Sequence, residues 1–106
     1  HLIGDDVLKE VSQIMQENIR STDIVGRWGG EEFMIISPNT DIDGAKILAE
    51  NIRKQIESKE FNIISKLTIS AGISKADPSL SQEGVLLKAD KALYRAKENG
   101  RNKVES

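Results

Sequence analysis

The sequence predicts an α/β fold of the α+β kind, in which helices flank a sheet that contains antiparallel strands. Apolar residues at helical spacing alternate along the chain with short β-prone segments, a pattern typical of helices packed on a sheet. The chain has 106 residues, the size of one small domain. Only about three strands are expected, fewer than most sheets contain, and none precedes the first helix. We therefore expect one domain over residues 1–106 that is incomplete on its N-terminal side.

The first expected helix covers residues 5–18. Its apolar residues recur at intervals of three and four and form one stripe: Val7, Leu8, Val11, Ile14 and Met15. Asp5 and Asp6 stand at its start, where the partial positive charge of a helix terminus favours acidic side chains.

A hairpin is expected next. Residues 24–28 and 31–37 are both rich in β-prone side chains, and the Gly29-Gly30 pair between them is typical of a two-residue turn. Pro38 ends the second run, because proline cannot donate a hydrogen bond to a neighbouring strand.

A second helix and a third strand follow the hairpin. Thr40 and Asp43 have the spacing of a capping box, with Asp in place of Glu or Gln, which predicts a helix from there to about Glu57. Its inward residues are expected to be Ala45, Leu48, Ala49, Ile52 and Ile56. Residues 67–73 alternate apolar and polar side chains, which predicts a half-buried strand.

The chain is expected to end with a helix and a short edge strand. Ser81 is a suitable N-cap for a helix that runs to about Asn99, and Gly100 suits the C′ position after it. The expected inward residues are Val85, Leu86, Ala89 and Leu93. Residues 102–104 are expected to form the edge strand.

The composition excludes several classes of protein. Lys and Arg total 15 and Asp and Glu total 17, so we expect no basic surface for a nucleic-acid polymer. The absence of cysteine excludes disulfides, thiolate metal sites and a catalytic thiol. No apolar run approaches the roughly 18 residues that span a bilayer, and no signal-peptide pattern follows His1. We expect a cytoplasmic domain.

The segment Gly29-Gly30-Glu31-Glu32-Phe33 carries the most chemical information. Backbone at glycine can approach a ligand closely and turn its N–H groups toward phosphate oxygens. Adjacent carboxylates on a strand point to opposite faces, so one of them can bind Mg²⁺, which prefers carboxylate and phosphate oxygens. The segment therefore suits a nucleotide–metal site, and the alternative is an ordinary tight hairpin with solvated acids.

The same segment resembles the signature of the GGDEF family of diguanylate cyclases, in the variant with Glu third. Four further segments resemble family motifs in the family's order: residues 1–5, 20–23, 67–73 and the C-terminal pair 89–97 with 99–102. The resemblance spans essentially the whole chain and is far more specific than the pentapeptide alone. It implies a ferredoxin-like palm of the nucleotide-cyclase type that lacks its first strand and helix in this chain.

The resemblance implies an activity. Family members join two GTP molecules into cyclic di-GMP and release two pyrophosphates. Two GTP-loaded domains face each other as a homodimer, and the 3′-hydroxyl of each GTP attacks the α-phosphate of the other. Mg²⁺ (or Mn²⁺) is the implied cofactor. Such chemistry depends mainly on positioning and electrostatic stabilisation, which a metal clamp and a phosphate cradle can supply.

The resemblance also implies roles for residues at the turn. Glu31 is the metal ligand and the candidate base, and Glu32 is its neighbour in the catalytic pair. Gly29 and Gly30 cradle phosphates through their backbone N–H groups.

Three residues outside the turn are expected to bind GTP. Asp5 accepts hydrogen bonds from the guanine edge, since an ionised carboxylate is only an acceptor. Lys97 and Arg101 hold the β- and γ-phosphates. Each has a structural alternative: Asp5 as a helix-start acid, Lys97 as a last-turn cation and Arg101 as a solvated surface residue.

Arg20 and Asp23 resemble the family's product-inhibition site for cyclic di-GMP. A guanidinium can meet a guanine edge or a phosphate in bidentate fashion, and a helix-end Arg followed by a turn Asp is the alternative. Some members carry a further anchoring Arg at the position of Asn51. Arg53 lies two residues on, about 200° around a helix, so we expect it not to substitute and inhibition to be weaker.

The family's domain begins with a strand that supplies a second metal-binding Asp, and this sequence has no such segment. That strand is expected between the hairpin and residues 67–73, so we expect the 106-residue chain itself to have little or no activity. A longer parent protein is the expected cyclase, with a sensor or receiver domain, and in some cases a membrane anchor, upstream. Two alternatives stay open: a non-catalytic regulatory module that binds GTP or cyclic di-GMP, and a plain dimerisation domain.

Overall fold

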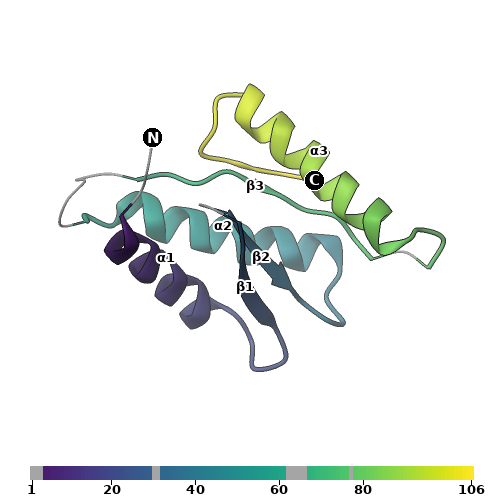
Figure 1. Ribbon diagram of the computed structural model, residues 1–106, viewed down its shortest axis with the longest axis horizontal. Helices are drawn as coiled ribbons and strands as arrows, with labels where there is room; N and C mark the ends of the chain where they lie inside the picture. Colours follow the sequence, from purple (N-terminus) through teal and green to yellow (C-terminus); the bar gives the residue numbers. More distant parts are fainter. Residues whose placement is uncertain (1–3, 30–31, 62–66, 77) are drawn as a thin grey trace.

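The computed structural model describes residues 4–29, 32–61, 67–76 and 78–106. Their elements follow the predicted order of helix, hairpin, helix, strand, helix and short final strand (Figure 1). The bounds are α1 (Asp5–Asn18), β1 (Ile24–Gly29), β2 (Glu32–Ile36), α2 (Ile42–Ser58), β3 (Ala71–Gly72), α3 (Gln82–Glu98) and β4 (Val104–Glu105). The mixture of helices and small sheets confirms the predicted α+β class. No helix in these parts of the chain is both long enough and apolar enough to cross a membrane.

The described strands form two separate sheets of two strands each. β1 and β2 pair antiparallel as the predicted hairpin, from Ile24 opposite Ile36 to Gly29 opposite Glu32. β3 and β4 pair parallel. Within the described residues no strand joins the hairpin to β3.

The first strand of the hairpin is one residue longer than predicted. Gly29 pairs with Glu32 and belongs to β1, while Gly30 and Glu31 lie outside the described residues. The register shifts between Arg27, which pairs with Phe33, and Gly29. An extra residue on one strand is a β-bulge, a feature that twists and bends the strand locally. The prediction that Gly29 is a turn residue is wrong, because Gly29 is paired in β1, and the sequence signal could not place the bulge.

The first two helices have different kinds of N-terminus. α1 has the predicted bounds and begins after Gly4, which has no side chain to cap the helix. The acidic residues of its first turn interact favourably with the helix dipole. The predicted capping box of α2 is wrong. Asp41 is the N-cap, and its side chain accepts a hydrogen bond of 2.7 Å from the Gly44 N–H. Thr40 contacts Arg20 instead.

Both predicted ends of α3 are confirmed. Ser81 is the N-cap, and its hydroxyl accepts a hydrogen bond of 3.1 Å from the Gly84 N–H. Gly100 has φ of 112°, a conformation that glycine adopts without steric penalty. The Arg101 N–H donates to the Ala96 carbonyl at 2.9 Å, which is the six-to-one bond of a Schellman motif.

The predicted strand over residues 67–73 is shorter in the structure. Regular pairing is limited to Ala71 and Gly72, opposite Val104 and Glu105. A strand is defined by its hydrogen-bonded partner, and the only pairing described for β3 is with the two residues of β4. The final strand also begins two residues later than predicted.

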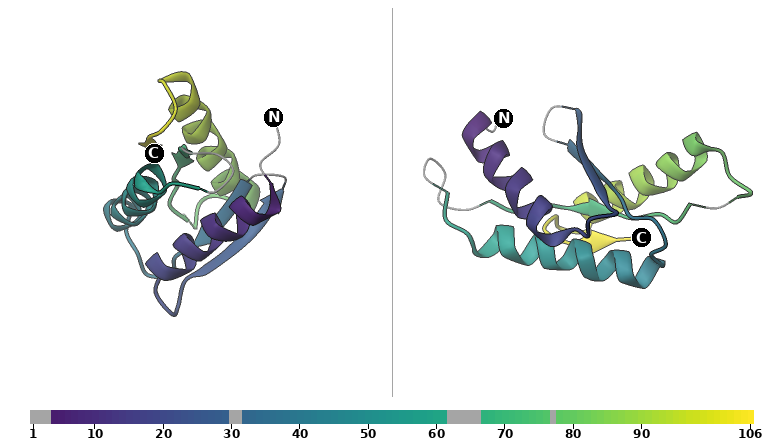
Figure 2. Two further views of the ribbon diagram at one scale, coloured as in Figure 1. Left: turned by 90° about the vertical axis from the view of Figure 1, so that its left-hand side faces the viewer. Right: turned by 90° about the horizontal axis from the view of Figure 1, so that it is seen from below.

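The main apolar core lies where α1 and α2 meet. Its buried members are Val7, Val11, Ile14, Met15, Ile52, Ile56 and Phe61. The hairpin contributes Val25, Phe33 and Ile35, and Leu48, Leu67 and Ile69 complete the packing. Figure 2 shows α1 and the hairpin on one side of α2, with β3 between α2 and α3. Most of the predicted apolar stripe of each helix therefore faces this core. Leu8, which is buried, and Ala45 and Ala49, which are half-buried, are not among its members.

α3 packs very closely on β3, and this changes its buried face. Ala92 and Ala96 are fully buried, whereas the predicted inward residues of α3 are only half-buried. A side chain at Gly72 would collide with the Ala89 carbonyl oxygen and the Leu93 backbone. Because the helix and the strand touch backbone to backbone, the residues at the centre of the contact must be small.

Candidate functional site

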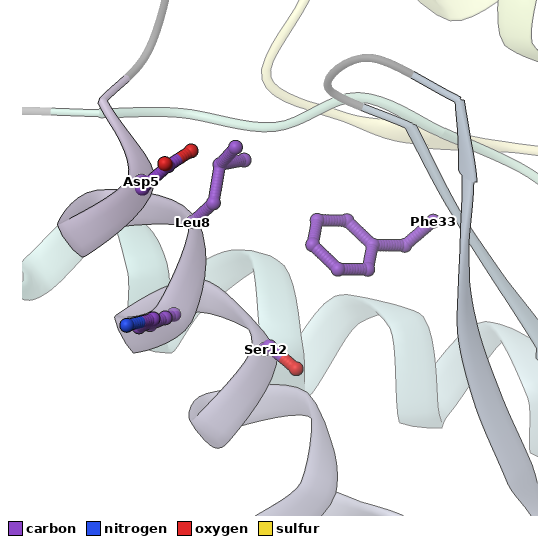
Figure 3. A pocket seen from close by; sticks show the side chains of 5 residues that line it. Asp5, Leu8, Ser12 and Phe33 are labelled. Carbon is purple, nitrogen blue, oxygen red and sulfur yellow. The ribbon is translucent and has the colours of Figure 1, made fainter.

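α1 and the hairpin bound an open hollow of about 360 Å³, lined by Asp5, Leu8, Lys9, Ser12 and Phe33. Figure 3 shows the Phe33 ring reaching from β2 toward α1, where Asp5, Leu8 and Ser12 form the opposite wall. The volume is within the range of sites for small molecules. An aromatic ring facing an apolar side chain, with a carboxylate at one end, suits a planar base that has hydrogen-bond donors on one edge.

The wall formed by α1 follows from helical spacing. Leu8 and Lys9 follow Asp5 by three and four residues, and Ser12 follows them by four and three, so the four residues share one face of the helix. We did not predict a site role for Leu8, Lys9, Ser12 or Phe33. The spacing from Asp5 was a signal that could have found the first three. Phe33 could not be assigned, because its position depends on how the hairpin packs on α1.

The hairpin brings Gly29 and Glu32 together as a pair at its closed end. Glu32 is exposed there. Gly30 and Glu31, the other two site residues predicted at the turn, lie outside the described residues. Among the residues that are described, no group of three or more His, Cys, Asp or Glu could hold a metal ion. The donor chemistry at the turn still fits a hard cation such as Mg²⁺, since adjacent glutamates offer only carboxylate oxygens.

Lys97 and Arg101 lie on α3 and on the segment that follows it. Lys97 is in the last turn of α3, and both side chains are exposed. The main packing partners of α3 are β3 and β4. Neither residue lines the hollow beside Asp5. The predicted phosphate-binding residues and the predicted guanine-binding residue are therefore separate in this structure.

Arg20 and Asp23 form the most tightly bonded pair among the predicted site residues. The Arg20 Nη2 lies 3.0 Å from Asp23 Oδ1, and the Arg20 backbone N–H donates to Oδ2 at 2.9 Å. The Asp23 side chain is 1% exposed and that of Arg20 53%. Hydrogen bonds from the Arg20 side chain and backbone hold the pKa of the Asp23 carboxyl below its ordinary value.

The same guanidinium reaches across to the loop after β2. Its Nη2 donates to the Pro38 carbonyl at 2.7 Å and contacts the Thr40 hydroxyl. Arg20 therefore ties the turn before β1 to the turn before α2, which supports a structural role for the pair. About half of the Arg20 side chain stays accessible to a ligand.

Comparison with known proteins identifies the family. The model of the diguanylate cyclase GGDEF domain matches residues 1–103. Diguanylate cyclase A of Treponema denticola is 43% identical over 98% of this chain, which spans 29% of that protein's length. Among solved structures, the active GGEEF domain of a diguanylate cyclase from Vibrio cholerae has a TM-score of 0.86 and 34% identity, over 95% of this chain and 66% of that chain.

A second solved structure carries a bound nucleotide. The GGDEF domain of DgcB from Caulobacter crescentus in complex with c-di-GMP has a TM-score of 0.88 and 29% identity, over 95% of this chain and 63% of that chain. The family match, the sequence relatives and the solved structures agree with the five motifs of the sequence. The chain belongs to the GGDEF domain family of diguanylate cyclases.

Proposed function

We propose that this chain is the greater part of a catalytic domain that condenses two GTP molecules into cyclic di-GMP and two pyrophosphates. The observation that carries the proposal is the hollow in which Asp5 faces Phe33, beside the hairpin end formed by Gly29 and Glu32. Asp5 accepts hydrogen bonds from the guanine edge, and the base lies against Phe33. The names of the relatives support the same reaction.

The reaction requires the hairpin and the C-terminal end of α3 to bind the same GTP molecule. A bond forms between the 3′-oxygen of one GTP and the α-phosphorus of the other, and the bond from that phosphorus to the leaving pyrophosphate breaks. The 3′-hydroxyl proton passes to a base, for which Glu31 is the candidate. Gly29 and Gly30 hold phosphate oxygens through their N–H groups, and Lys97 and Arg101 hold the β- and γ-phosphates. Glu31 would hold Mg²⁺, which offsets phosphate charge when bound, and Glu32 is its neighbour in the catalytic pair.

Each domain holds one GTP, so the product requires two domains. We propose a homodimer in which the two sites face each other, since each GTP must supply its 3′-hydroxyl to the other. We also propose a regulatory domain in the same polypeptide, of the sensor or receiver type. This chain spans less than a third of the length of the Treponema relative, which leaves room for one. The site faces the cytoplasm, where GTP is available.

Arg20 and Asp23 are proposed to bind cyclic di-GMP as a product-inhibition site. The accessible part of the Arg20 guanidinium supplies the donors, and the buried Asp23 fixes its plane. The complex of DgcB with c-di-GMP supports a nucleotide-binding role for this fold. The structural role described above is compatible with this, because a guanidinium has five N–H donors.

The 106 residues by themselves are proposed to have little or no cyclase activity. One feature supports this: the described strands form two unconnected sheets, so no described strand joins the hairpin to β3. The test is chromatographic detection of cyclic di-GMP after incubation with GTP and Mg²⁺, for this chain and for the longer native protein. Production by the native protein and its loss in Glu31→Gln are expected. Robust production by the 106-residue chain alone would overturn the proposal for the chain.

The same experiment separates the alternatives. A non-catalytic regulatory module would bind GTP or cyclic di-GMP without turnover even in the native protein. A plain dimerisation domain would bind neither nucleotide. Equilibrium binding of both nucleotides, measured beside turnover, therefore distinguishes the three functions.

A further inference from the structure

The segment after α3 has an unusual backbone. Gly100, Arg101 and Asn102 have φ of 112°, 62° and 49°, so three successive residues occupy the left-handed region. Glycine adopts this region freely and asparagine tolerates it, but an arginine is strained there by its Cβ atom. Residues of this kind persist only where surrounding contacts hold them. Among the described residues, the hydrogen bond at Arg101 itself is the one from its backbone N–H to the Ala96 carbonyl, and the neighbouring Asn102 makes several more.

Asn102 supplies that support through both ends of its amide. Arg53 Nη1 donates to Asn102 Oδ1 at 2.8 Å, and Asn102 Nδ2 donates to Glu57 Oε2 at 2.6 Å. Its backbone N–H also donates to the Ser70 hydroxyl at 3.1 Å. These partners are separated from Asn102 by 49, 45 and 32 residues along the chain. Through Asn102 alone, the loop is therefore hydrogen-bonded both to α2 and to the segment before β3.

The two partners on α2 are themselves fixed. Arg53 and Glu57 are one helical turn apart and form an ion pair at 3.4 Å, and Arg53 Nε bonds to Glu50. The Arg53 side chain is 14% exposed. A guanidinium that is shielded from solvent and bonded to two carboxylates and an amide is held rigidly. Arg53 is thus occupied inside the structure, in agreement with the expectation that it does not serve as a second anchor for cyclic di-GMP.

We propose that Arg53, Glu57 and Asn102 form a positioning cluster that fixes the left-handed conformation of Arg101 and so the direction from which its guanidinium meets the phosphates of a bound nucleotide. The proposal rests on the proposed function, in which the exposed Arg101 binds the β- and γ-phosphates. The three residues do not touch the nucleotide themselves. They act through Arg101, because the backbone conformation of the loop sets the direction of the Arg101 Cα–Cβ bond.

The first test is structural and needs no nucleotide. NMR measurement of the intraresidue N–H to Hα contact at Arg101 reports whether φ is positive. The wild-type chain and the control Asn99→Ala, whose side chain makes one long contact of 3.5 Å to Glu105, are expected to keep the left-handed conformation. Asn102→Ala is expected to lose it. Asn102→Gly still tolerates a positive φ at residue 102 and removes only the side-chain amide contacts. This variant replaces Asn102→Ala if that protein does not fold. We expect Arg101 to become mobile in Asn102→Gly. An unchanged, ordered Arg101 in Asn102→Gly would overturn the proposal.

The second test is a double-mutant cycle with inorganic pyrophosphate as the probe. Asn102→Ala is expected to weaken pyrophosphate binding about tenfold, and to have no further effect in an Arg101→Ala background. Equal losses in both backgrounds would show that Asn102 does not act through Arg101 and would overturn the proposal. If Arg101→Ala binds as the wild type does, the phosphate role in the proposed function fails instead, and the NMR result still decides the positioning role.

Discussion

The Asp23 carboxylate lies 3.0 Å from Nη2 of Arg20 and is almost wholly shielded from solvent, while the Arg20 side chain is half exposed. The pair therefore has an inner member that fixes geometry and an outer member that can meet a ligand. Because the same guanidinium also bonds to the Pro38 carbonyl, its orientation is set before any ligand arrives. An arginine held in this way loses little conformational freedom on binding.

Replacing Arg20 should weaken the binding of cyclic di-GMP. Arg20→Ala removes charged donors, each hydrogen bond of this kind contributing about 1.5–3 kcal/mol, so we expect an affinity loss of about tenfold or more. The measurement is a calorimetric titration with cyclic di-GMP. Arg95→Ala is a matched control, because Arg95 is an exposed arginine on α3 whose side chain donates to the Ser106 backbone oxygen. Equal affinity in wild type and Arg20→Ala would exclude Arg20 from the binding site.

The Asp23 carboxylate should make stability depend on acidity. Its pKa in the folded state is lowered from the ordinary value of 3.8 by the Arg20 hydrogen bonds. A group with a lowered pKa stabilises the folded state at pH values above its unfolded pKa, and this contribution is lost as the pH falls through the folded pKa. The free energy of unfolding of the wild type should therefore exceed that of Asp23→Asn by a constant amount from pH 7 to about pH 5. Below about pH 4 the difference should shrink.

Urea denaturation of both proteins at pH 7, 5 and 3 measures this difference directly. Taking the difference between the two proteins removes the contribution of the other carboxylates. A gap that is the same at all three pH values would show that Asp23 is not stabilised as a carboxylate by Arg20.

Enlarging Gly72 should destabilise the contact between α3 and β3. The Cβ of Gly72→Ala would collide with backbone atoms of Ala89 and Leu93, and backbone cannot move aside as a side chain can. We expect a loss of about 1–3 kcal/mol in the free energy of unfolding. Gly26→Ala is the control, since a Cβ there meets nothing within 4 Å. If the two alanine variants prove equally stable in urea, the close packing of α3 on β3 is wrong.

The cap of α2 can be tested with two substitutions at one residue. Asp41→Ala removes the acceptor for the Gly44 N–H and should lower the free energy of unfolding by about 1 kcal/mol. Asp41→Asn should remain close to the wild type, because asparagine caps helices as well as aspartate does. A large loss in Asp41→Asn would indicate that the negative charge matters more than the cap.

Much of the fold followed from local sequence signals. The bounds of α1, the Ser81 cap and the Gly100 terminus were predictable because each depends on residues within one turn. The start of α2 was not, since Thr40 had the capping spacing but is bonded to Arg20, 20 residues away. Alternation along residues 67–73 predicted a strand, yet the paired length depends on a distant partner. The buried alanines of α3 depend likewise on the close approach at Gly72.

The residues of the candidate site likewise divide into those that local motifs predicted and those that depend on distant contacts. Asp5, Arg20 and Asp23 were found because they stand in short motifs, and the structure shows that Arg20 and Asp23 do pair. The role of Phe33 opposite Asp5 and the bonds of Asn102 to Arg53 and Glu57 join segments far apart in sequence. Such contacts leave no periodic pattern, so one sequence could not reveal them.

The most direct test concerns the guanine base in the hollow beside Asp5. If Asp5 accepts hydrogen bonds from N1–H and the exocyclic amine, then inosine triphosphate, which lacks that amine, should bind about tenfold more weakly than GTP to the native protein. Asp5→Ala should bind GTP and inosine triphosphate equally. The measurement is an equilibrium titration of both nucleotides with both proteins. A preference for GTP that survives in Asp5→Ala, or no preference in the wild type, would contradict a guanine site at Asp5.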